Sequence, residues 1–553
     1  MSITLTPEQA AFAGCERRFV VGLAGPGSGK TTTIGELVSG MTDQAAQTTV
    51  VLSFTRESAN RLKSKMSGKQ LFFVGTVHAF CRELLIQGGA TIGLPTDLAP
   101  CDEDASRELQ SDLAEKLKID EDVKDLAEAC YYNPVALPDR FPQKFSQAAK
   151  RFAMTYHKTL LDRRQLDFDA MLTWGIKLLQ SGYQHGITQL IVDEVQDSSA
   201  FEWLVYSGLK THRVWMVGDL DQAIYEWRRA APEKLLDFCR NKAVEVFQIK
   251  HNYRSGPAIC AAATRLIGHN KSRIDKAVVP ADPAKSSRAV VNCYRTQAHE
   301  MAALVEWAKI DADRAVILRS NAGVAAVRKA LVAADIKPVG TAEKPKDFNV
   351  HIALVALIAN PQNNEVVNTW AIRRLGSARA KKLRLESEST SRPLIDLVLA
   401  NPDFEWLSSL IDGARSEPVE DIVEECVSDA SEATRELLLS CADGAKRMSD
   451  VVVAASEVMA ESKKDGVWVG TIHRAKGLEW GSVWLPRWNA GIFPMRTPAT
   501  EEERRLAFVS ITRAINDVTI SWADEIEDQW KPGSTRQGFP SLFIGETGLG
   551  GVR

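Results

Sequence analysis

The sequence feature that most constrains the fold is a glycine-rich loop at residues 24–31 (AGPGSGKT), which follows an apolar run and precedes a helical pattern. Glycines let a backbone wrap closely around an anion, so that N–H groups and the helix N-terminus face the phosphates of a nucleotide. We expect Lys30 to reach the β- and γ-phosphates and Thr31 to bind Mg²⁺. A turn without function is the alternative, and the strand, helix, Lys and Thr together disfavour it. The residues predicted to bind the nucleotide are Ala24, Gly25, Gly27, Ser28, Gly29, Lys30, Thr31 and Thr32.

Strand-like runs alternate with helical patterns in two regions of the chain. The first region has them at residues 18–23, 48–54, 71–74, 189–192 and 214–217, and the second at 289–294, 315–319, 467–471 and 482–485. Strands separated by helices indicate an α/β fold with parallel sheets and helices on both faces. A mostly helical stretch interrupts each region. At about 150 residues per domain, the chain length suggests three to four folding units.

Net charge and cysteine content exclude several classes of protein. With 68 basic and 71 acidic residues the net charge is −3, which excludes a wholly basic protein that coats nucleic acid but not a local basic groove. Nine cysteines without a CxxC pair argue against disulfide and zinc frameworks and are typical of a reducing cytoplasm. The most apolar stretch, residues 350–359, is about half as long as a membrane span, and the N-terminus does not resemble a secretory signal. We expect a soluble cytoplasmic protein with no membrane partner.

Two carboxylates end the apolar run at residues 190–197 (LIVDEVQD). A site for a nucleotide and its metal needs such a pair. Asp193 is expected to hold Mg²⁺ through its water shell, and Glu194 to orient and deprotonate the attacking water. The alternative is an acidic cap at the end of a strand, which the neighbouring phosphate-binding loop makes less attractive.

A second acidic strand end lies at residues 217–230 (VGDLDQAIYEWRRA). Gln222 in this run is placed to sense the γ-phosphate. Tyr225 and Trp227, with Arg228 beside them, can stack on bases and hold phosphates, as in many single-strand-binding proteins. Core packing is the alternative for an aromatic pair.

These blocks, in this order, resemble the superfamily 1 helicases of the UvrD/Rep/PcrA group. The resemblance extends to the residue blocks 5–12 (LTPEQAAF), 53–59 (SFTRESA), 75–81 (GTVHAFC), 166–172 (LDFDAML), 252–255 (NYRS), 470–480 (GTIHRAKGLEW), 501–514 (EEERRLAFVSITRA) and 539–544 (FPSLFI). It therefore covers residues 5 to 544. It implies two RecA-like motor domains, with ATP and Mg²⁺ as cofactors.

The resemblance also implies roles around the nucleotide. Gln9 is similar to the family's reader of adenine. Tyr253 corresponds to the residue that stacks on adenine, and Glu479 to the ribose contact. Arg254 and Arg513 correspond to the two arginines that reach the γ-phosphate from the second motor domain, where they neutralise developing charge as arginine fingers do. Hydrolysis would then depend on closure of the two domains.

On the strand side, the resemblance implies stacking pegs and contacts to the strand backbone. The pegs are Phe54, Tyr225 and Trp227. The backbone contacts are Thr76, His78, Thr471 and His473. For either histidine, a structural imidazole with satisfied hydrogen bonds is the alternative.

The domain boundaries predicted from these patterns divide the chain into six segments. The first motor domain comprises residues 1–82 and 166–250, with a helical insertion at 83–165, and the second comprises 251–343 and 464–553, with a helical insertion at 344–463. Residues 344–346 and 463–465 are candidate hinges. In the second insertion, residues 373–376 read RRLG where the family has an Arg-Gly-Ile-Gly turn that grips duplex backbone. The basic residues that follow suit phosphate contacts and a solvated helix face equally well. They are Arg379, Lys381, Lys382 and Arg384.

The sequence thus predicts an ATP-dependent DNA helicase or translocase. By resemblance it moves 3′ to 5′ on single-stranded DNA and unwinds tailed duplexes in DNA repair, replication or recombination. The alternative is an ATP-gated strand-binding translocase that unwinds little alone and acts with a protein partner. That partner would be a nuclease or repair factor, with a role in phage defence or in the removal of recombinase filaments. We expect no room for an appended nuclease domain after Arg513, so any nuclease would be a separate chain. An RNA helicase fits less well, because residues 224–227 (IYEW) and 252–255 (NYRS) resemble the DNA branch.

Overall fold

A computed structural model describes residues 5–66, 68–96, 98–101, 103–119, 122–310, 313–340, 347–375, 377–459, 466–527 and 534–552. The chain forms two compact units. The first comprises Met1–Cys101, Gln110–Pro338 and Gly466–Arg553, and the second Asp102–Leu109 and Val339–Asp465. The predicted hinges, residues 344–346 and 463–465, lie outside the described residues.

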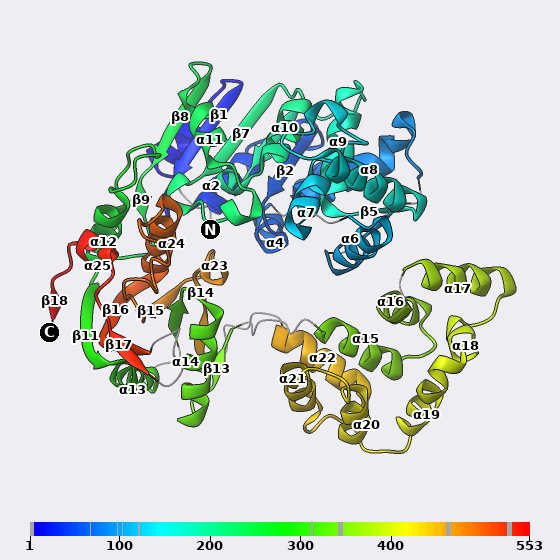
Figure 1. Ribbon diagram of the computed structural model, residues 1–553. Helices are drawn as coiled ribbons and strands as arrows, with labels where there is room; N and C mark the ends of the chain where they lie inside the picture. The colour runs from blue at the N-terminus through cyan, green and yellow to red at the C-terminus, as the bar shows by residue number, and fades with distance from the viewer. Residues whose placement is uncertain are drawn as a thin grey trace. The chain divides into compact units, whose positions relative to one another are not determined.

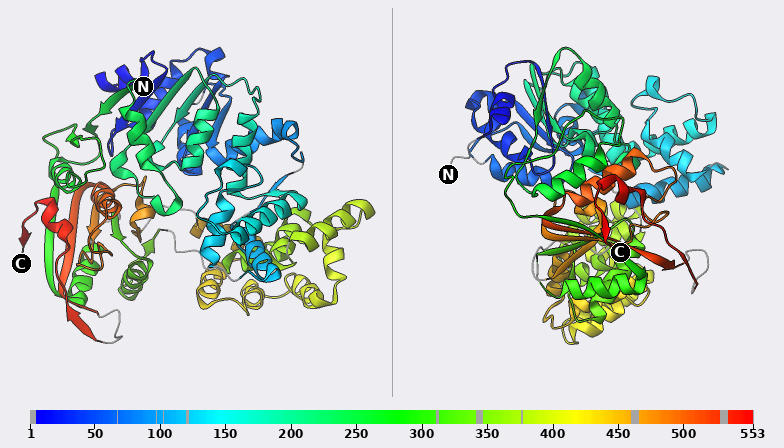
Figure 2. Two further views of the ribbon diagram at one scale, coloured as in Figure 1. Left: turned by 45° about the horizontal axis from the view of Figure 1, so that its top comes forward. Right: turned by 90° about the vertical axis from the view of Figure 1, so that its left-hand side faces the viewer.

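The first sheet of the first unit is parallel throughout, in the order β3-β2-β6-β7-β1-β8. Its strands are β1 (Phe19–Ala24), β2 (Thr49–Ser53), β3 (Phe73–Thr76), β6 (Gln189–Val192), β7 (Arg213–Gly218) and β8 (Val244–Ile249). Both faces are buried, so β2 has no exposed residue. Helices therefore cover the sheet on each side (Figures 1 and 2).

Alternate residues of the strands in the first sheet belong to two separate apolar cores. Val21 and Leu23 join one core with α5 (Val77–Gly88), α9 (Phe168–Gln180) and α10 (Ala200–Gly208). Val20 and Ala24 join the other with α2 (Lys30–Ser39) and α4 (Arg56–Lys65). Because successive residues of a strand point to opposite faces, one short apolar run supplies both cores.

The second sheet of the first unit has the order β13-β14-β12-β15-β16-β11-β18. Its strands are β11 (Arg288–Thr296), β12 (Arg314–Leu318), β13 (Pro338–Val339), β14 (Val467–Thr471), β15 (Trp480–Leu485), β16 (Ala514–Glu527) and β18 (Gly551–Val552), with β17 (Thr535–Gln537) antiparallel to β16. α13 (Gln297–Ala308) and α14 (Asn321–Ala333) contribute to its apolar core. The prediction of an α/β fold with two parallel sheets is confirmed.

The longest strands that were not predicted are β8 and β16. In β8 (VEVFQI) and β16 (AINDVTISWADEIE), polar residues interrupt the apolar ones. β8 is the edge of its sheet, and only some residues of β16 are buried. A half-exposed strand needs no continuous apolar run, so its pattern is weak in the sequence.

The predicted first helical insertion contains α6 (Glu103–Leu117), α7 (Val123–Tyr131) and α8 (Gln147–Asp162). A two-stranded parallel pair joins β4 (Ala99–Pro100) to β5 (Gln165–Leu166), where the chain leaves and re-enters the sheet domain. The backbone N–H of Cys101 donates to Leu166 O at 2.7 Å. This pairing lies close to the predicted return point at residue 166.

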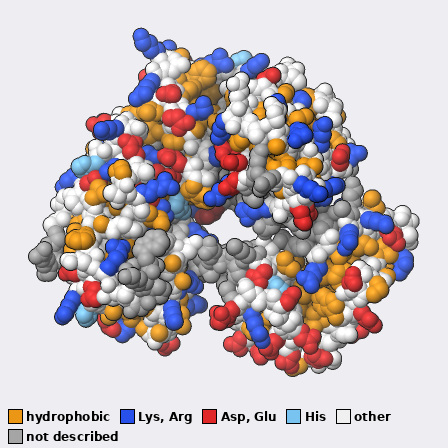
Figure 3. Space-filling model, viewed as in Figure 1, with side chains coloured by type: hydrophobic (Ala, Val, Ile, Leu, Met, Phe, Trp, Pro, Cys, Tyr) orange, Lys and Arg blue, Asp and Glu red, His pale blue; other side chains and the backbone are white. Residues whose placement is uncertain are grey.

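The described residues 347–459 of the second unit contain helices and no strand. The α-helices are α15 (Phe348–Ala359), α16 (Asn364–Leu375), α17 (Ser377–Thr390), α18 (Leu394–Leu399), α19 (Glu405–Gly413), α20 (Val419–Cys426), α21 (Glu432–Ala442) and α22 (Met448–Met459). Their core surrounds Trp370, which meets Phe404 edge-on at 5.3 Å between ring centroids. α20 turns its carboxylates to solvent and buries Ile422 and Val423, and acidic side chains gather over this part of the unit (Figure 3).

The RRLG run ends α16. Arg374 is exposed, with Nη1 3.9 Å from Asp429 Oδ2. The side chains of Arg373 and Lys381 and all of Gly376 lie outside the described residues. Arg379, Lys382 and Arg384 are exposed, which agrees with a solvated face and with phosphate contacts.

Candidate active site

The predicted phosphate-binding loop lies between the carboxyl end of β1 and the start of α2. Gly27 and Gly29 have φ of 64° and 79°, in the left-handed region that favours glycine. A Cβ on Gly27 would lie 2.7 Å from Cβ of Arg254, so the position has no room for a side chain. Ser28 Oγ donates to Gly25 O at 2.8 Å and tightens the turn. The loop is therefore a narrow backbone cradle, which is the form a phosphate requires.

Lys30 and the two predicted carboxylates come together at the ends of β1 and β6. Lys30 Nζ lies 3.1 Å from Glu194 Oε2. Asp193 is 4% exposed, and its Oδ1 accepts from the backbone N–H of Glu194 at 3.0 Å. Glu194 has φ of 52°, a strained conformation for a non-glycine residue at the strand end.

Burial and neighbouring charge set the pKa values of this group. Burial lowers the pKa of Lys30, but Glu194 and other carboxylates more than offset it, so the pKa is raised. Burial, with the charge of Glu194, raises the pKa of Asp193 to about 7. Burial also raises the pKa of Glu194, but Lys30 and Lys476 outweigh it and bring it to about 2. Glu194 paired with Lys30 is therefore an ionised hydrogen-bond acceptor, better suited to orienting water than to binding a proton.

Gln222 and both predicted arginine fingers meet between the two sheets. Arg513 Nη2 lies 3.5 Å from Gln222 Oε1, and its Nε donates to Val509 O at 3.0 Å. Arg254 Nη1 donates to Thr512 O at 3.2 Å, beside Arg513. Burial and the nearby Arg254 lower the pKa of Arg513 to about 9, so it stays charged at neutral pH.

The residues predicted to contact the base and ribose lie around the loop. Gln9 Nε2 donates to Ser28 O at 2.9 Å, and Gln9 Oε1 accepts from the Thr6 N–H at 2.9 Å. Tyr253 donates its backbone N–H to Gly27 O at 2.9 Å, while its side chain remains 54% exposed. The carboxylate of Glu479 accepts from Arg254 Nε at 2.5 Å. Gln9 and Glu479 thus already hold protein partners, whereas the Tyr253 ring is accessible for stacking.

The predicted Mg²⁺ ligands fit a cation held jointly with a nucleotide. Thr31 lies in the first turn of α2, which follows β1, and Asp193 follows β6 at the same carboxyl end of the parallel sheet, where β7 separates the two strands. Thr32 Oγ1 instead accepts from Lys65 Nζ at 2.8 Å. In the described part of the chain, no three His, Cys, Asp or Glu side chains are grouped to hold a metal alone. A hydroxyl and a carboxylate suit Mg²⁺ when phosphate oxygens and waters complete its coordination.

The predicted stacking residues form one aromatic cluster. Phe54, which follows β2, stacks on Tyr225 with ring centroids 4.9 Å apart. Trp227 is 66% exposed, which excludes core packing for this residue. The His473 ring lies 6.0 Å from Tyr225 and 5.9 Å from Trp227, and Arg228 lies over the Phe54 and Trp227 rings at 5.6 Å. The cluster thus joins segments from both sheets.

The residues predicted to contact the strand backbone differ in whether their side chains already have a protein partner. Thr76 Oγ1 accepts from the Ala79 N–H at 3.3 Å as the cap of α5. Thr471 is the N-cap of α23 (Ile472–Ala475), and its side chain makes no capping hydrogen bond. His78 meets Phe168 edge-on, with ring centroids 5.6 Å apart. Burial lowers the pKa of His78 and of His473 to about 4, so both imidazoles are neutral at neutral pH.

Several residues at the junction were not predicted individually. Lys476 pairs with Asp197 and donates to Gln222 O at 2.8 Å. Arg505 pairs with Glu226 and donates to Ala223 O at 2.7 Å. Lys476 falls inside block 470–480 and Arg505 inside block 501–514. A basic residue inside such a block is the sequence feature that could have marked each as a candidate for an ion pair. Nothing local shows which carboxylate each reaches.

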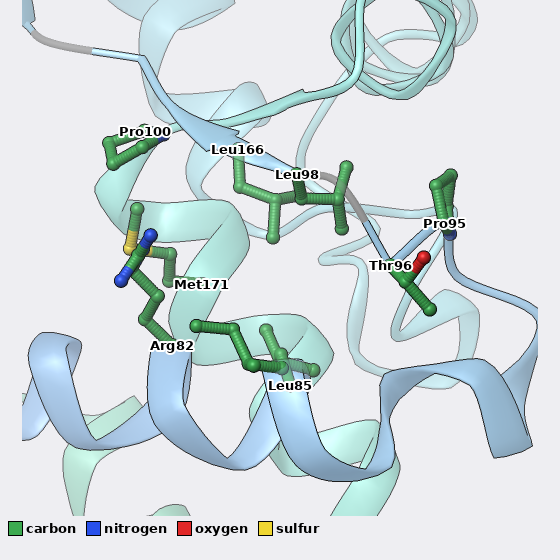
Figure 4. A pocket seen from close by; sticks show the side chains of 9 residues that line it. Arg82, Leu85, Pro95, Thr96, Leu98, Pro100, Leu166 and Met171 are labelled. Atoms are coloured by element: carbon green, nitrogen blue, oxygen red, sulfur yellow. The ribbon is translucent and has the colours of Figure 1, made fainter.

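Two cavities in the described part of the chain are lined by residues other than these. A pocket of about 10 Å³ lies between α5 and the β4–β5 pair, where Leu85, Leu98 and Leu166 converge (Figure 4). It holds at most one water molecule. A larger cavity of about 460 Å³ lies within the second unit, beside Trp370 and Trp406. No helix in the described ranges is long and apolar enough to span a bilayer.

Comparison with known proteins agrees with this geometry. The family model of the UvrD/REP helicase N-terminal domain matches residues 5–243, and that of the UvrD-like helicase C-terminal domain matches residues 446–525. The chain is 26% identical to DNA helicase II of Haemophilus influenzae, over 95% of this chain and 84% of the relative. It is 25% identical to DNA helicase II of Escherichia coli, over 98% and 87%. It is also 25% identical to the ATP-dependent DNA helicase PcrA of Leuconostoc citreum, over 95% and 82%.

The matches confirm the resemblance found in the motifs. They extend over nearly the whole chain, and the N-terminal model includes both the loop at residues 24–31 and the strand end at residues 190–197. The chain belongs to the UvrD/Rep family of helicases.

Proposed function

We propose that this ATP-driven DNA helicase moves 3′ to 5′ along single-stranded DNA and unwinds tailed duplexes during repair, replication or recombination. One observation carries the proposal. Two short helical turns, η4 (Leu220–Gln222) and η5 (Glu226–Arg228), lie on one continuous segment. The first holds the proposed γ-phosphate sensor Gln222, and the second holds the exposed Trp227. A movement of Gln222 when the nucleotide is hydrolysed can therefore be transmitted along this segment to Trp227 and the bound strand.

On the nucleotide side, the residues present can bind ATP and stabilise its hydrolysis. The cradle at residues 24–29 and Lys30 bind phosphates, and Glu194 and Gln222 orient water. Arg254 and Arg513 neutralise charge that develops on the transferred phosphoryl group. Thr31 and Asp193 would hold Mg²⁺ together with the nucleotide, and the ion would supply further charge neutralisation. Gln9, Tyr253 and Glu479 surround the base and ribose.

On the strand side, Phe54, Tyr225 and Trp227 offer stacking faces, and Arg228 adds a positive charge. Stacking tolerates any sequence because every base has a π-face. Thr76, His78, Thr471 and His473 contact the strand backbone through neutral hydrogen bonds. The 3′ to 5′ direction rests on membership of the family.

Two motor domains would form the nucleotide cleft. We propose residues 1–82 with 166–250 for the first and 251–343 with 464–553 for the second. The insertions occupy 83–165 and 344–463. The β4–β5 pairing and the separate helical unit formed mainly by residues 339–465 support these limits.

Strand displacement tests the proposal. Duplexes with a 3′ tail, a 5′ tail or no tail are incubated with ATP and Mg²⁺, and ATP hydrolysis is measured in parallel. Lys30→Ala is the blank. Lys309→Ala, which removes an exposed lysine paired with Glu306, is the matched control. Displacement of the 3′-tailed duplex alone, lost in Lys30→Ala and kept in Lys309→Ala, is expected.

Other outcomes overturn parts of the proposal. Displacement of the 5′-tailed duplex alone refutes the direction. Strand-stimulated hydrolysis without displacement shows a translocase that needs a protein partner for unwinding. Full hydrolysis in Lys30→Ala refutes the assigned site.

A further inference from the structure

Asp219 lies at the centre of a buried hydrogen-bond cluster that joins the two sheets. It follows β7 and is fully buried. Its Oδ1 accepts from the Asp221 N–H at 3.0 Å and pairs with the ammonium group of Lys276. Its Oδ2 accepts from Gln222 Nε2 at 2.5 Å. Both carboxylate oxygens are therefore engaged, one of them by the proposed sensor of the γ-phosphate.

Protein groups contact both side-chain polar atoms and the backbone carbonyl of Gln222. Its amide nitrogen donates to Asp219, and its amide oxygen lies 3.5 Å from Arg513 Nη2. Its backbone carbonyl accepts from Lys476 at 2.8 Å. Since the amide nitrogen can only donate and the oxygen only accept, an ionised Asp219 selects one orientation of the Gln222 amide.

Lys276 comes from the segment between α12 (Pro257–Ile267) and β10 (Val279–Pro280). Its side chain is 4% exposed. Arg273 in the same segment binds both oxygens of Asp221, at 3.0 and 2.9 Å. The backbone N–H groups of Lys271 and Ser272 donate to Glu501 on α24 (Glu501–Ile511), which ties the segment to the second sheet's helices.

We propose that Lys276 is a positioning residue for ATP hydrolysis, which acts through Asp219 to orient the amide of Gln222. This role rests on the proposed function, because it presumes that Gln222 faces the nucleotide. Lys276 lies outside the sequence blocks that carry the resemblance.

The physical reason is the cost of an unpaired buried charge. A carboxylate with no exposure and no cation beside it loses far more solvation than hydrogen bonds return, so it takes up a proton. A protonated Asp219 can donate as well as accept, and no longer selects the orientation of Gln222. Lys30 also bears on Asp219, but its ammonium group is paired with Glu194.

The test is a double-mutant cycle on the full chain. Lys276→Met keeps the length of the side chain and removes its charge, Asp219→Asn removes the opposite charge, and the double variant removes both. Strand-stimulated kcat, the KM for ATP and thermal unfolding are measured for each. Arg504→Met breaks a comparably buried bidentate pair with Glu546 that also contacts Asn270, and serves as the control for lost stability.

We expect Lys276→Met to lower kcat on the order of 100-fold, the effect of misplacing a reacting group by about 1 Å. The KM for ATP should change less than about threefold, because the loop and Lys30 are untouched. In Asp219→Asn, the ammonium group of Lys276 attracts the oxygen of the new Asn side chain. The Asn amide nitrogen then faces the amide nitrogen of Gln222, and because both are donors, the Gln222 orientation is lost and kcat falls similarly. In the double variant the Asn oxygen is free to accept from Gln222, so the loss is smaller than in either single variant.

Three results overturn the proposal: an unchanged kcat in Lys276→Met, a loss that appears in KM alone, or losses that multiply in the double variant. An equal loss of kcat in Arg504→Met would show a general effect of stability and also overturn it. If Lys276→Met does not fold, Asp219→Asn and the double variant carry the test, and a parental kcat in Asp219→Asn refutes it. Failure of the proposed function is distinguishable, because the unmodified chain would then show no strand-stimulated hydrolysis.

Discussion

Removal of the Trp227 indole separates the strand-binding role from a structural one. The side chain is 66% exposed, with Arg228 over its ring at 5.6 Å and His473 meeting it edge-on. Few buried contacts are lost in Trp227→Ala, so stability should change by less than about 0.5 kcal/mol. If one base stacks on the remaining face, strand affinity falls by about 1–3 kcal/mol. That corresponds to about a 5- to 150-fold rise in Kd.

Fluorescence anisotropy with a labelled oligothymidylate, without nucleotide, measures the Kd at fixed salt. Thermal unfolding of the same samples measures stability. Trp406→Ala is the matched control, because Trp406 is also exposed, at 43%, and belongs to the helical unit rather than to the unit that contains this cluster. We expect its Kd to equal that of the parent chain.

Two results would refute the reasoning about Trp227. An unchanged Kd means that no base stacks on the indole, whatever its exposure. A raised Kd together with a lowered unfolding temperature means that the ring supports the turn at η5. An equal rise in the Trp406→Ala variant would show that the assay responds to any lost tryptophan.

Two further predictions concern the arginine fingers and the histidines. Arg254→Ala should reduce strand-stimulated hydrolysis by about 10³- to 10⁵-fold, because an arginine finger acts on the transition state. The Kd of a fluorescent ATP analogue should change little, because Glu479, the partner of Arg254, is half-exposed and loses little when unpaired. Hydrolysis within tenfold of the parent chain contradicts this prediction. Burial lowers the pKa of His78 from 6.5 to about 4, so between these pH values the unfolded chain binds a proton that the folded chain does not. The stability of the parent relative to His78→Gln should thus be constant above pH 6.5 and fall as the pH drops from 6.5 to 5 in urea unfolding. A relative stability that rises on acidification would show that the imidazole is charged in the folded protein.

The local sequence determined the phosphate-binding loop and the strand and helix beside it. The loop at residues 24–31 needs a strand before it, glycines within it and a helix after it, and all three are neighbours in the chain. The structure confirms β1, the left-handed Gly27 and Gly29, and α2. Both parallel sheets and the family could be predicted, whereas β8 and β16 escaped because their polar residues conceal the strand pattern. The predicted domain limits and residue roles stay predictions.

The tertiary structure decided which charges meet. Lys276 and Asp219 are 57 residues apart, and Arg513 and Gln222 are 291 apart. Sequence patterns placed Arg513 and Gln222 at one site only through the resemblance, and they did not single out Lys276. Arginine and lysine have no intrinsic preference for one carboxylate over another, so pairing is set by which strand ends and loops the packed sheets bring together. A motif is written in consecutive residues, but a buried ion pair exists only after folding has excluded water around both partners.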